Sequence, residues 1–319
     1  KPGSVGGLGF NYKWNMGWMN DMLSYISLNP FFRMNNHNKL TFSMMYAFSE
    51  NYVLPISHDE VVYGKCSLIN KMPGNYEEKF AGVRSFLGYM MAHPGKKLGF
   101  MGYEFGQFNE WDYHKQLDFF LVDEYEMHRK LQSYVKALND FYASTAAFFE
   151  VEDSWDGFEW LAPNDADRNI VSFIRRDKKG NEVIALISFS GADNPGYWMG
   201  VNKRGKYRIV FNSDDKKYGG DGKIKKSVFT ATKKPSHGKM YSVVIDVPKL
   251  TCLYFVKEPD PPKAEKLPAA GPKKKVQTAS VKAGKTAAKT TEKAPAAESA
   301  KAAPAKKSTA KTAKKPDLK

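Results

Sequence analysis

Cysteine is scarce in this sequence: Cys66 and Cys252 are the only two among 319 residues. They lie far apart, with no CxxC pattern and no neighbouring histidines, so the sequence excludes a disulfide-rich scaffold. We expect two free thiols in a reducing cytosol, with a single structural disulfide as the alternative.

Long apolar runs are missing as well. No stretch of about 20 apolar residues occurs, so we expect no membrane-spanning helix. The first four residues are not followed by the apolar segment of a signal peptide. We therefore expect a cytoplasmic protein. Because the chain does not begin with Met, we also expect that it is cut from a longer one.

Aromatic residues are absent after Phe255, where the composition changes. From Lys257 onward, the sequence contains 17 lysines and six acidic residues. This segment therefore carries a net charge of +11, out of +15 for the chain. Such a segment buries too little surface to offset its chain entropy, so we expect residues 258–319 to be disordered. This tail is either an arm that binds nucleic acid or another polyanion, or a solubilising extension. It lacks arginine, which makes nucleic-acid binding the less favoured alternative.

What is present in residues 1–150 is an alternation of strand-like and helix-like segments. Strands are predicted at 52–57 and 97–102, with a short strand or loop at 8–13. Helices are predicted at 17–28, 76–93 and 124–149. This order indicates about three parallel βα units. A complete (β/α)8 TIM barrel needs about 250 residues, so we expect only the later part of such a barrel.

Residues 151–257 are predicted to form a separate all-β domain, an antiparallel β-sandwich, because short strands alternate with turn sequences. The predicted strands cover residues 169–175, 182–189, 207–212, 227–232, 240–247 and 251–256.

The first candidate site is the row Ser57-His58-Asp59-Glu60, directly after the apolar run 52–56. Catalytic residues of a TIM barrel lie at the carboxyl ends of its strands. One interpretation is therefore an acid/base and charge-stabilising cluster. A second is metal ligation, although neighbouring residues of a strand point to opposite faces. In the third, the charges cap the following turn and pair with Lys65.

A second strand end also leads into polar residues. Glu104 and Gln107 follow the predicted strand at 97–102, and Trp111 lies a few residues beyond. Carboxylates and amides can bind the hydroxyls of a sugar, and an aromatic ring can stack on the sugar ring. The alternative for Glu104 is an internal salt bridge.

Several specific motifs follow one another along the chain. They are VGGLGFNYKWNMGWMND at 5–21, LPISHDEVV at 54–62 with Gly64-Lys65, MPG at 72–74, PGKKL at 94–98, FMGYEF at 100–105 with Glu110-Trp111, GFEWL at 157–161, the turn RRD at 175–177 and SHG at 236–238. In this order they closely resemble the motifs of bacterial 1,4-α-glucan (glycogen) branching enzymes, which belong to the α-amylase-type glycoside hydrolase superfamily. The resemblance covers about residues 5–257.

The resemblance implies a retaining glycosyl transfer from an α-1,4-glucan to a 6-hydroxyl, without metal or organic cofactor. It assigns Asp59 as the carboxylate that stabilises the transition state, and His58 as its neighbour on the sugar hydroxyls. The other predicted substrate-binding residues are Glu60, Lys65, Glu104, Gln107 and Trp111.

The sequence departs from the family in one important respect. The resemblance places the nucleophilic Asp and the acid/base Glu on strands before the one that opens this chain, and neither motif occurs in residues 1–319. Glu60 and Glu104 are not positional substitutes. We therefore expect the chain alone to be inactive. The alternatives are a related amylase-superfamily hydrolase or debranching enzyme, and a glucan-binding protein without catalysis.

Overall fold

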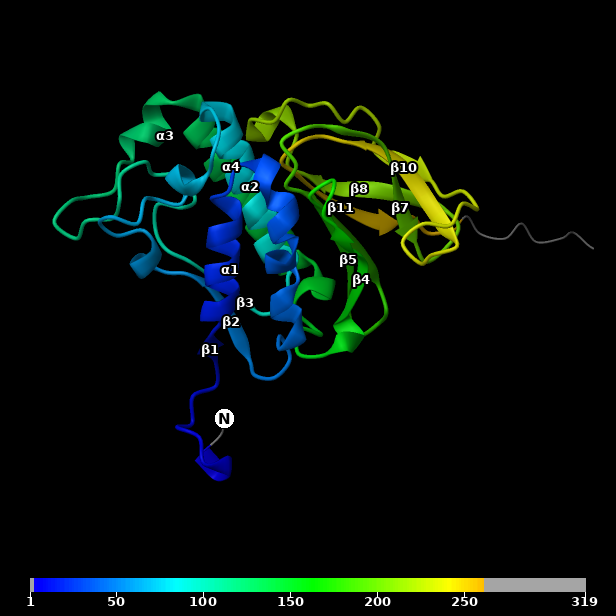
Figure 1. Cartoon of the computed structure of the whole chain (residues 1–319), viewed down its shortest axis with the longest axis horizontal. Helices are drawn as coiled ribbons and strands as arrows, with labels where there is room; N and C mark the ends of the chain where they lie inside the picture. Colours follow the sequence, from blue (N-terminus) through cyan, green and yellow to red (C-terminus); the bar gives the residue numbers. More distant parts are fainter. Residues whose placement is uncertain (1–2, 261–319) are drawn as a thin grey trace, which may run out of the picture. The chain divides into compact units, whose positions relative to one another are not determined.

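The computed structural model of the chain describes residues 3–260 (Figure 1). Most of the tail predicted to be disordered, residues 258–319, therefore lies outside the described residues. Its first residue is not detached: the Glu258 N–H donates a hydrogen bond of 2.8 Å to the Lys206 carbonyl. No helix within residues 3–260 is both long enough and apolar enough to cross a bilayer.

The first half of the chain contains a parallel sheet of three strands in the order β1-β2-β3. Helix α1 follows β1, and α2 connects β2 to β3, so the predicted parallel βα units are present. The elements are β1 (Lys13–Trp14), α1 (Met16–Ile26), β2 (Tyr52–Ile56), α2 (Tyr76–Ala92), β3 (Lys96–Gly99), α3 (Phe120–Glu124) and α4 (Glu126–Ser144), with short 3-10 helices at Gly3–Val5, Pro30–Leu40, Phe42–Met45, His58–Glu60, Ile69–Lys71 and Ala146–Phe148.

Local sequence explains where α2 begins and ends. Asn75 forms a capping box with Glu78, in which each side chain accepts a backbone N–H of the other residue. The helix ends at Ala92 because His93 precedes a proline and takes an extended conformation.

The segment 8–13, predicted as a short strand or loop, is an exposed loop of which only Lys13 enters a strand. Two other predicted elements differ from the structure. The strand predicted at 97–102 ends at Gly99, because a tight turn follows in which Gly102 has a φ of 94°. The helix predicted at 124–149 is wrong at both ends, since Tyr125 and Thr145 have extended backbones that interrupt it.

The second half is antiparallel throughout, with a six-stranded sheet in the order β4-β5-β6-β11-β8-β9 and a two-stranded sheet, β10-β7. Strands β4 and β7 were missed because Pro163 and the Pro195-Gly196 pair are typical of turns. Arg175 and Arg176 end strand β5 and do not lie in the turn after it. The strands are β4 (Phe158–Asp165), β5 (Ile170–Arg176), β6 (Glu182–Ser188), β7 (Asn194–Val201), β8 (Lys206–Asn212), β9 (Val228–Thr230), β10 (Tyr241–Val247) and β11 (Thr251–Lys257), with 3-10 helices at Trp155–Gly157 and Lys216–Tyr218.

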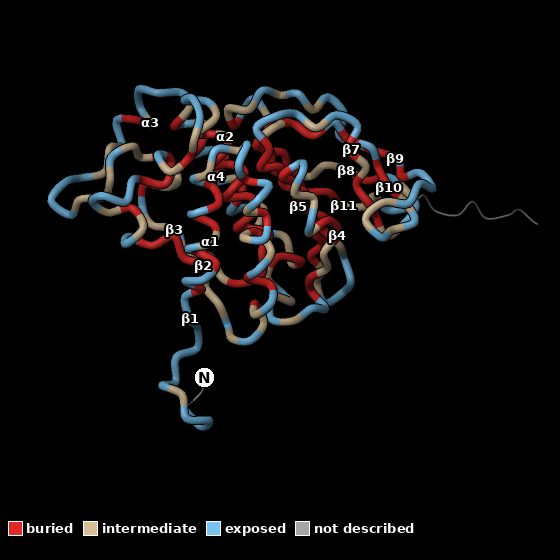
Figure 2. Tube along the Cα trace, viewed as in Figure 1, coloured by how far each residue is buried: buried red, intermediate tan, exposed pale blue. Residues whose placement is uncertain are grey.

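The six-stranded sheet is buried on both faces. Ile174 and Leu253 pack with the two-stranded sheet on one face, whereas Phe173 and Tyr254 pack with α2 and α4 on the other. Figure 2 shows this buried interior beside the exposed β1. One core thus runs across residue 150, where the sequence predicts a domain boundary.

Three buried arginines tie the two halves together through main-chain carbonyls. Arg33 donates to Phe189 O at 2.7 Å, Arg84 to Ser213 O at 3.1 Å, and Arg175 to Ala92 O at 2.7 Å. Burial lowers the pKa of each guanidinium to about 10, so all three stay charged at neutral pH.

Candidate functional site

The two strand ends singled out in the sequence lie side by side. Strands β2 and β3 are parallel neighbours, with Ile56 opposite Gly99. The Phe100 N–H donates to the Ile56 carbonyl at 2.8 Å, so the pairing continues just past β3. The loops after both strands therefore begin at one edge of the sheet, as expected for parallel strands.

Trp111 joins these two loops. The main-chain N–H of Trp111 donates to the Val61 carbonyl at 2.8 Å, and the residue forms an isolated parallel bridge with Val62. The indole ring packs edge-on against Phe100, with centroids 5.0 Å apart, and against His58 at 5.8 Å. Main-chain contacts with Val61 and Val62, in the loop after β2, thus hold Trp111 so that its ring contacts His58 in that same loop.

His58 and Asp59 form the polar part of this cluster. They lie in the single 3-10 turn His58–Glu60, and Nε2 of His58 is 3.2 Å from Oδ1 of Asp59. The two side chains remain 46% and 60% exposed, so their polar atoms are open to a ligand. Of the predicted residues, the structure brings His58, Asp59 and Trp111 together.

Glu60 and Lys65 pair with each other at 3.9 Å, with the Glu60 side chain only 13% exposed. This contact is the one expected from the third interpretation, in which charges hold the turn. Lys65 also has a structural role in its backbone, because its carbonyl accepts a hydrogen bond from the Lys71 ammonium.

Glu104 and Gln107 are engaged within the second loop. Oε2 of Glu104 accepts from the Gly102 N–H at 2.8 Å, which caps its own turn. Gln107 donates to the Asn109 carbonyl at 3.3 Å and accepts from the Asp118 N–H at 3.2 Å. Gln107 lines two hollows beside Trp111, whereas the Glu104 carboxylate is turned back on its own loop.

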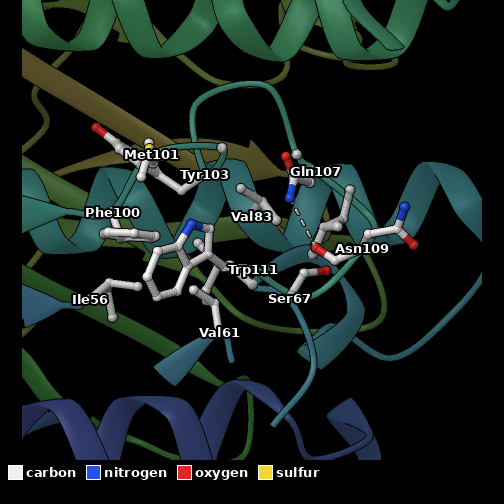
Figure 3. A pocket seen from close by; sticks show the side chains of 14 residues that line it. Ile56, Val61, Ser67, Val83, Phe100, Met101, Tyr103, Gln107, Asn109 and Trp111 are labelled. Atoms are coloured by element: carbon white, nitrogen blue, oxygen red, sulfur yellow. Dashed lines mark hydrogen bonds between the residues drawn. The ribbon is translucent and has the colours of Figure 1, made fainter. Parts of the chain in front are cut away.

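Two hollows adjoin Trp111. The smaller has a volume of about 20 Å³, room for about one water. Figure 3 shows the Trp111 indole in its lining, between Phe100 and Val61. The larger, of about 620 Å³, is in the size range of small-molecule sites. It is lined on one side by Val62 and Tyr63 and on the other by Gln107, Asn109–Tyr113 and residues 115–118.

The comparisons with known proteins agree with this arrangement. The family model for the C-terminal all-beta domain of alpha amylase matches residues 160–258. Two solved structures share the fold: an alpha-amylase from H. orenii (TM-score 0.50, 13% identity, 78% of this chain and 49% of that one) and AmyP in complex with maltose (TM-score 0.53, 12% identity, 78% and 50%).

Sequence relatives are much more similar. The 1,4-alpha-glucan branching enzyme GlgB of Halothermothrix orenii is 49% identical over 255 residues, which are 80% of this chain and 40% of the relative. The branching enzyme GlgB of Aquifex aeolicus is 49% identical over 259 residues, which are 81% of this chain and 41% of the relative. The chain is a homologue of 1,4-alpha-glucan branching enzymes. This confirms the resemblance carried by the sequence motifs. The chain spans about two fifths of the length of these curated relatives.

One structural residue of this branching-enzyme homologue was missed by sequence reasoning. The Glu110 carboxylate accepts the N–H groups of Cys66 at 2.6 Å and Gly64 at 3.0 Å. These hydrogen bonds, that of Cys66 foremost, lower the pKa of Glu110. No local signal could have revealed the contact, because its partners lie more than 40 residues away in sequence.

Within residues 3–260, no group of three His, Cys, Asp or Glu side chains is placed to bind a metal ion. Both cysteines are free thiols, as predicted, with Cys66 exposed beside the site and Cys252 buried.

Proposed function

We propose that this chain serves in glycogen branching, in which an α-1,4-glucan is cut and the released chain is joined to a 6-hydroxyl as an α-1,6 branch. The observation that supports this most directly is the cluster of His58, Asp59 and Trp111 at the shared end of β2 and β3, in a chain 49% identical to a named branching enzyme. The substrate is an α-1,4-glucan, and the cytoplasm is the proposed location.

The architecture that we propose places β1, β2 and β3 as the last strands of a (β/α)8 barrel. The parallel order of the three strands, with helices between them, and the likeness to amylase folds support this assignment. Residues 1–150 would be barrel, 151–257 the all-β domain and 258–319 a disordered tail.

Asp59 and His58 would bind hydroxyls of the sugar at the cleavage point, and Trp111 and Gln107 would line the glucan path. In the first step, a carboxylate bonds to the anomeric carbon while the α-1,4 bond breaks and an acid protonates the leaving oxygen. In the second, the acceptor 6-hydroxyl gives up its proton and displaces that carboxylate. Glu60, Lys65 and Glu104 would keep the two loops in position.

The loops described here do not offer a second and third free carboxylate for this chemistry. Glu60 pairs with Lys65, Glu104 accepts from Gly102, and Glu110 accepts from Gly64 and Cys66. In the second loop, Asp112 accepts from the His114 N–H and pairs with Lys115, and Asp118 accepts from Asn109. Each is occupied in holding a loop. We therefore propose that the nucleophile and the acid/base come from elements beyond these loops, and that residues 1–319 alone do not branch glucan.

The test compares the full product of the gene that encodes this sequence with residues 1–319 alone, on linear amylose. New α-1,6 linkages are measured by proton NMR, and iodine absorbance follows the loss of long linear chains. We expect branching by the full product only. Chain shortening without new α-1,6 linkages would identify a hydrolase or debranching enzyme, and binding without turnover a glucan-binding protein. Branching by residues 1–319 alone would contradict the argument about the occupied carboxylates.

The role of Asp59 is tested by Asp59→Asn in the full product. Removing a group that stabilises the transition state costs about 10²–10³ in kcat, so we expect a loss of at least that size. The thermal midpoint should not change, because the Asp59 side chain is largely exposed. Asp123→Asn, on exposed α3, is the matched control and should keep full activity. An active Asp59→Asn variant would remove Asp59 from the mechanism.

A further inference from the structure

Positive charge is concentrated in one segment of the all-β half. Residues 203–239 contain twelve basic and three acidic residues, a net charge of +9. Because the tail from Lys257 onward has +11 and the whole chain +15, the rest of the sequence is net negative. This segment was not singled out in the sequence.

The segment contains β8 and the edge strand β9 of the six-stranded sheet, together with the connections around them. It does not lie wholly at this edge, because Lys239 pairs with Glu159 on β4, the strand at the opposite edge. Lys206 and Arg208 project from the same face of β8, because the ring of Tyr207 between them is buried in the core. Eleven of the twelve basic residues are exposed; only Lys239 is partly buried.

Several of these cations are free to meet a ligand. Among residues 3–260, no ion-pair partner accompanies Lys203, Arg204, Lys206 or Lys233. Asp214 offsets little of the surface charge, because it is buried and its carboxylate accepts the N–H groups of Asp221 and Lys223.

The basic tail starts beside this edge. Glu258 donates its N–H to the Lys206 carbonyl at 2.8 Å, and its carboxylate pairs with Arg208. The described chain ends two residues later at Asp260, which pairs with Lys257 at 2.7 Å. Of the residues from Lys257 onward, the structure therefore places only 257–260, and it places them beside β8.

We propose that the exposed edge formed by residues 203–239 is a docking surface for nucleic acid, bound through the phosphate backbone and without sequence specificity. Unlike the tail, the edge contains arginine: Arg204 and Arg208 lie among ten lysines, and both kinds of cation bind phosphate. The large apolar side chains of the segment, Tyr207, Phe211, Tyr218 and Phe229, are buried. The edge therefore presents charge without the apolar anchor that membrane insertion requires. This proposal does not depend on the proposed function.

The test measures the anisotropy of a short labelled DNA duplex with the full chain over a series of salt concentrations. The edge variant replaces Lys203, Arg204, Lys206 and Lys233 by Gln. Each phosphate contact contributes about −0.9 to the slope of log K against log salt, so the loss of four contacts should make the slope shallower by about 3.6. At constant low salt the affinity should fall at least tenfold. Thermal midpoints verify that the variants fold.

The matched control makes the same change in charge elsewhere, with Lys13, Lys39, Lys130 and Lys136 replaced by Gln, and should leave the slope unchanged. Equal losses in both variants would show a general effect of net charge and overturn the proposal. It would also be overturned if the edge variant binds like the parent, since the tail alone would then be responsible. Tighter binding to phosphatidylserine vesicles than to DNA would point to a membrane instead.

Discussion

The junction around Arg175 and the loops around Trp111 are both assembled from distant parts of the chain, but different forces hold them. At the junction, buried guanidinium groups donate to main-chain carbonyls beside the apolar core that both halves share. In the loops, partly exposed carboxylates accept main-chain N–H groups, and the Trp111 indole packs against Phe100 and His58. Burial makes the first region expensive to disturb. Exposure leaves the second accessible to a ligand and sensitive to pH.

The largest expected effect is at the junction. Arg175 is fully buried and donates to the carbonyls of Ala92, Phe148 and Gly157 at 2.7 to 3.2 Å. Arg175→Met would leave these carbonyls buried without partners, so we expect a loss of about 4 kcal/mol in the free energy of unfolding. Urea denaturation measures it.

Arg168→Met is the control for this comparison, because Arg168 is largely exposed and makes only a short-range ion pair. Its urea midpoint should stay close to that of the parent. If Arg175→Met were as stable as Arg168→Met, the junction would not depend on its buried guanidinium groups.

A smaller effect is expected where α2 touches the sheet. A Cβ added at Gly88 would lie 2.4 Å from Sγ of Cys252, on β11. Gly88→Ala must therefore push the helix and the sheet apart, at a cost of about 2 kcal/mol. Gly82→Ala on the same helix meets only the flexible Met72 side chain, at 3.1 Å, and should cost much less. Equal unfolding midpoints for the two variants would refute this close packing.

The smallest effect concerns Glu110 in the loops and is seen as a pH dependence. Its pKa is lowered in the folded chain, so its hydrogen bonds are intact above the ordinary value of about 4.3. They are lost as the pH falls through the lower, folded value. In NMR spectra, the amide protons of Gly64 and Cys66 should then shift together. Glu110→Gln should abolish this titration without changing the fold, and a persistent titration would assign it to another group.

Sequence reasoning worked best where local signals and periodicity agree. The apolar spacing and the Pro94-Gly95 pair predict α2 almost to the residue, and the structure adds the capping box of Asn75. It failed where tertiary contacts override local preference. Strand β7 contains Pro195 and Gly196, yet it pairs with β10, because its buried residues cover the six-stranded sheet.

The candidate site divides in the same way. The sequence predicts that His58 and Trp111 follow two strands of one parallel sheet, and hence that they lie at one edge. It does not predict their ring contact or the pairing of Val62 with Trp111, since these depend on how two loops fold over each other. The roles of the site residues stay predictions until they are assayed.

The sequence by itself determined the longer helices, most of the strands and the resemblance to branching enzymes, because apolar spacing, strand runs and motifs are properties of short stretches. Only the tertiary structure decided which carboxylates hold loops and which remain open, as Glu110 and Asp59 illustrate. It alone decided that Arg175 donates to both halves and that the tail starts beside Lys206. These contacts join residues that are distant along the chain, and only folding brings them within hydrogen-bond distance.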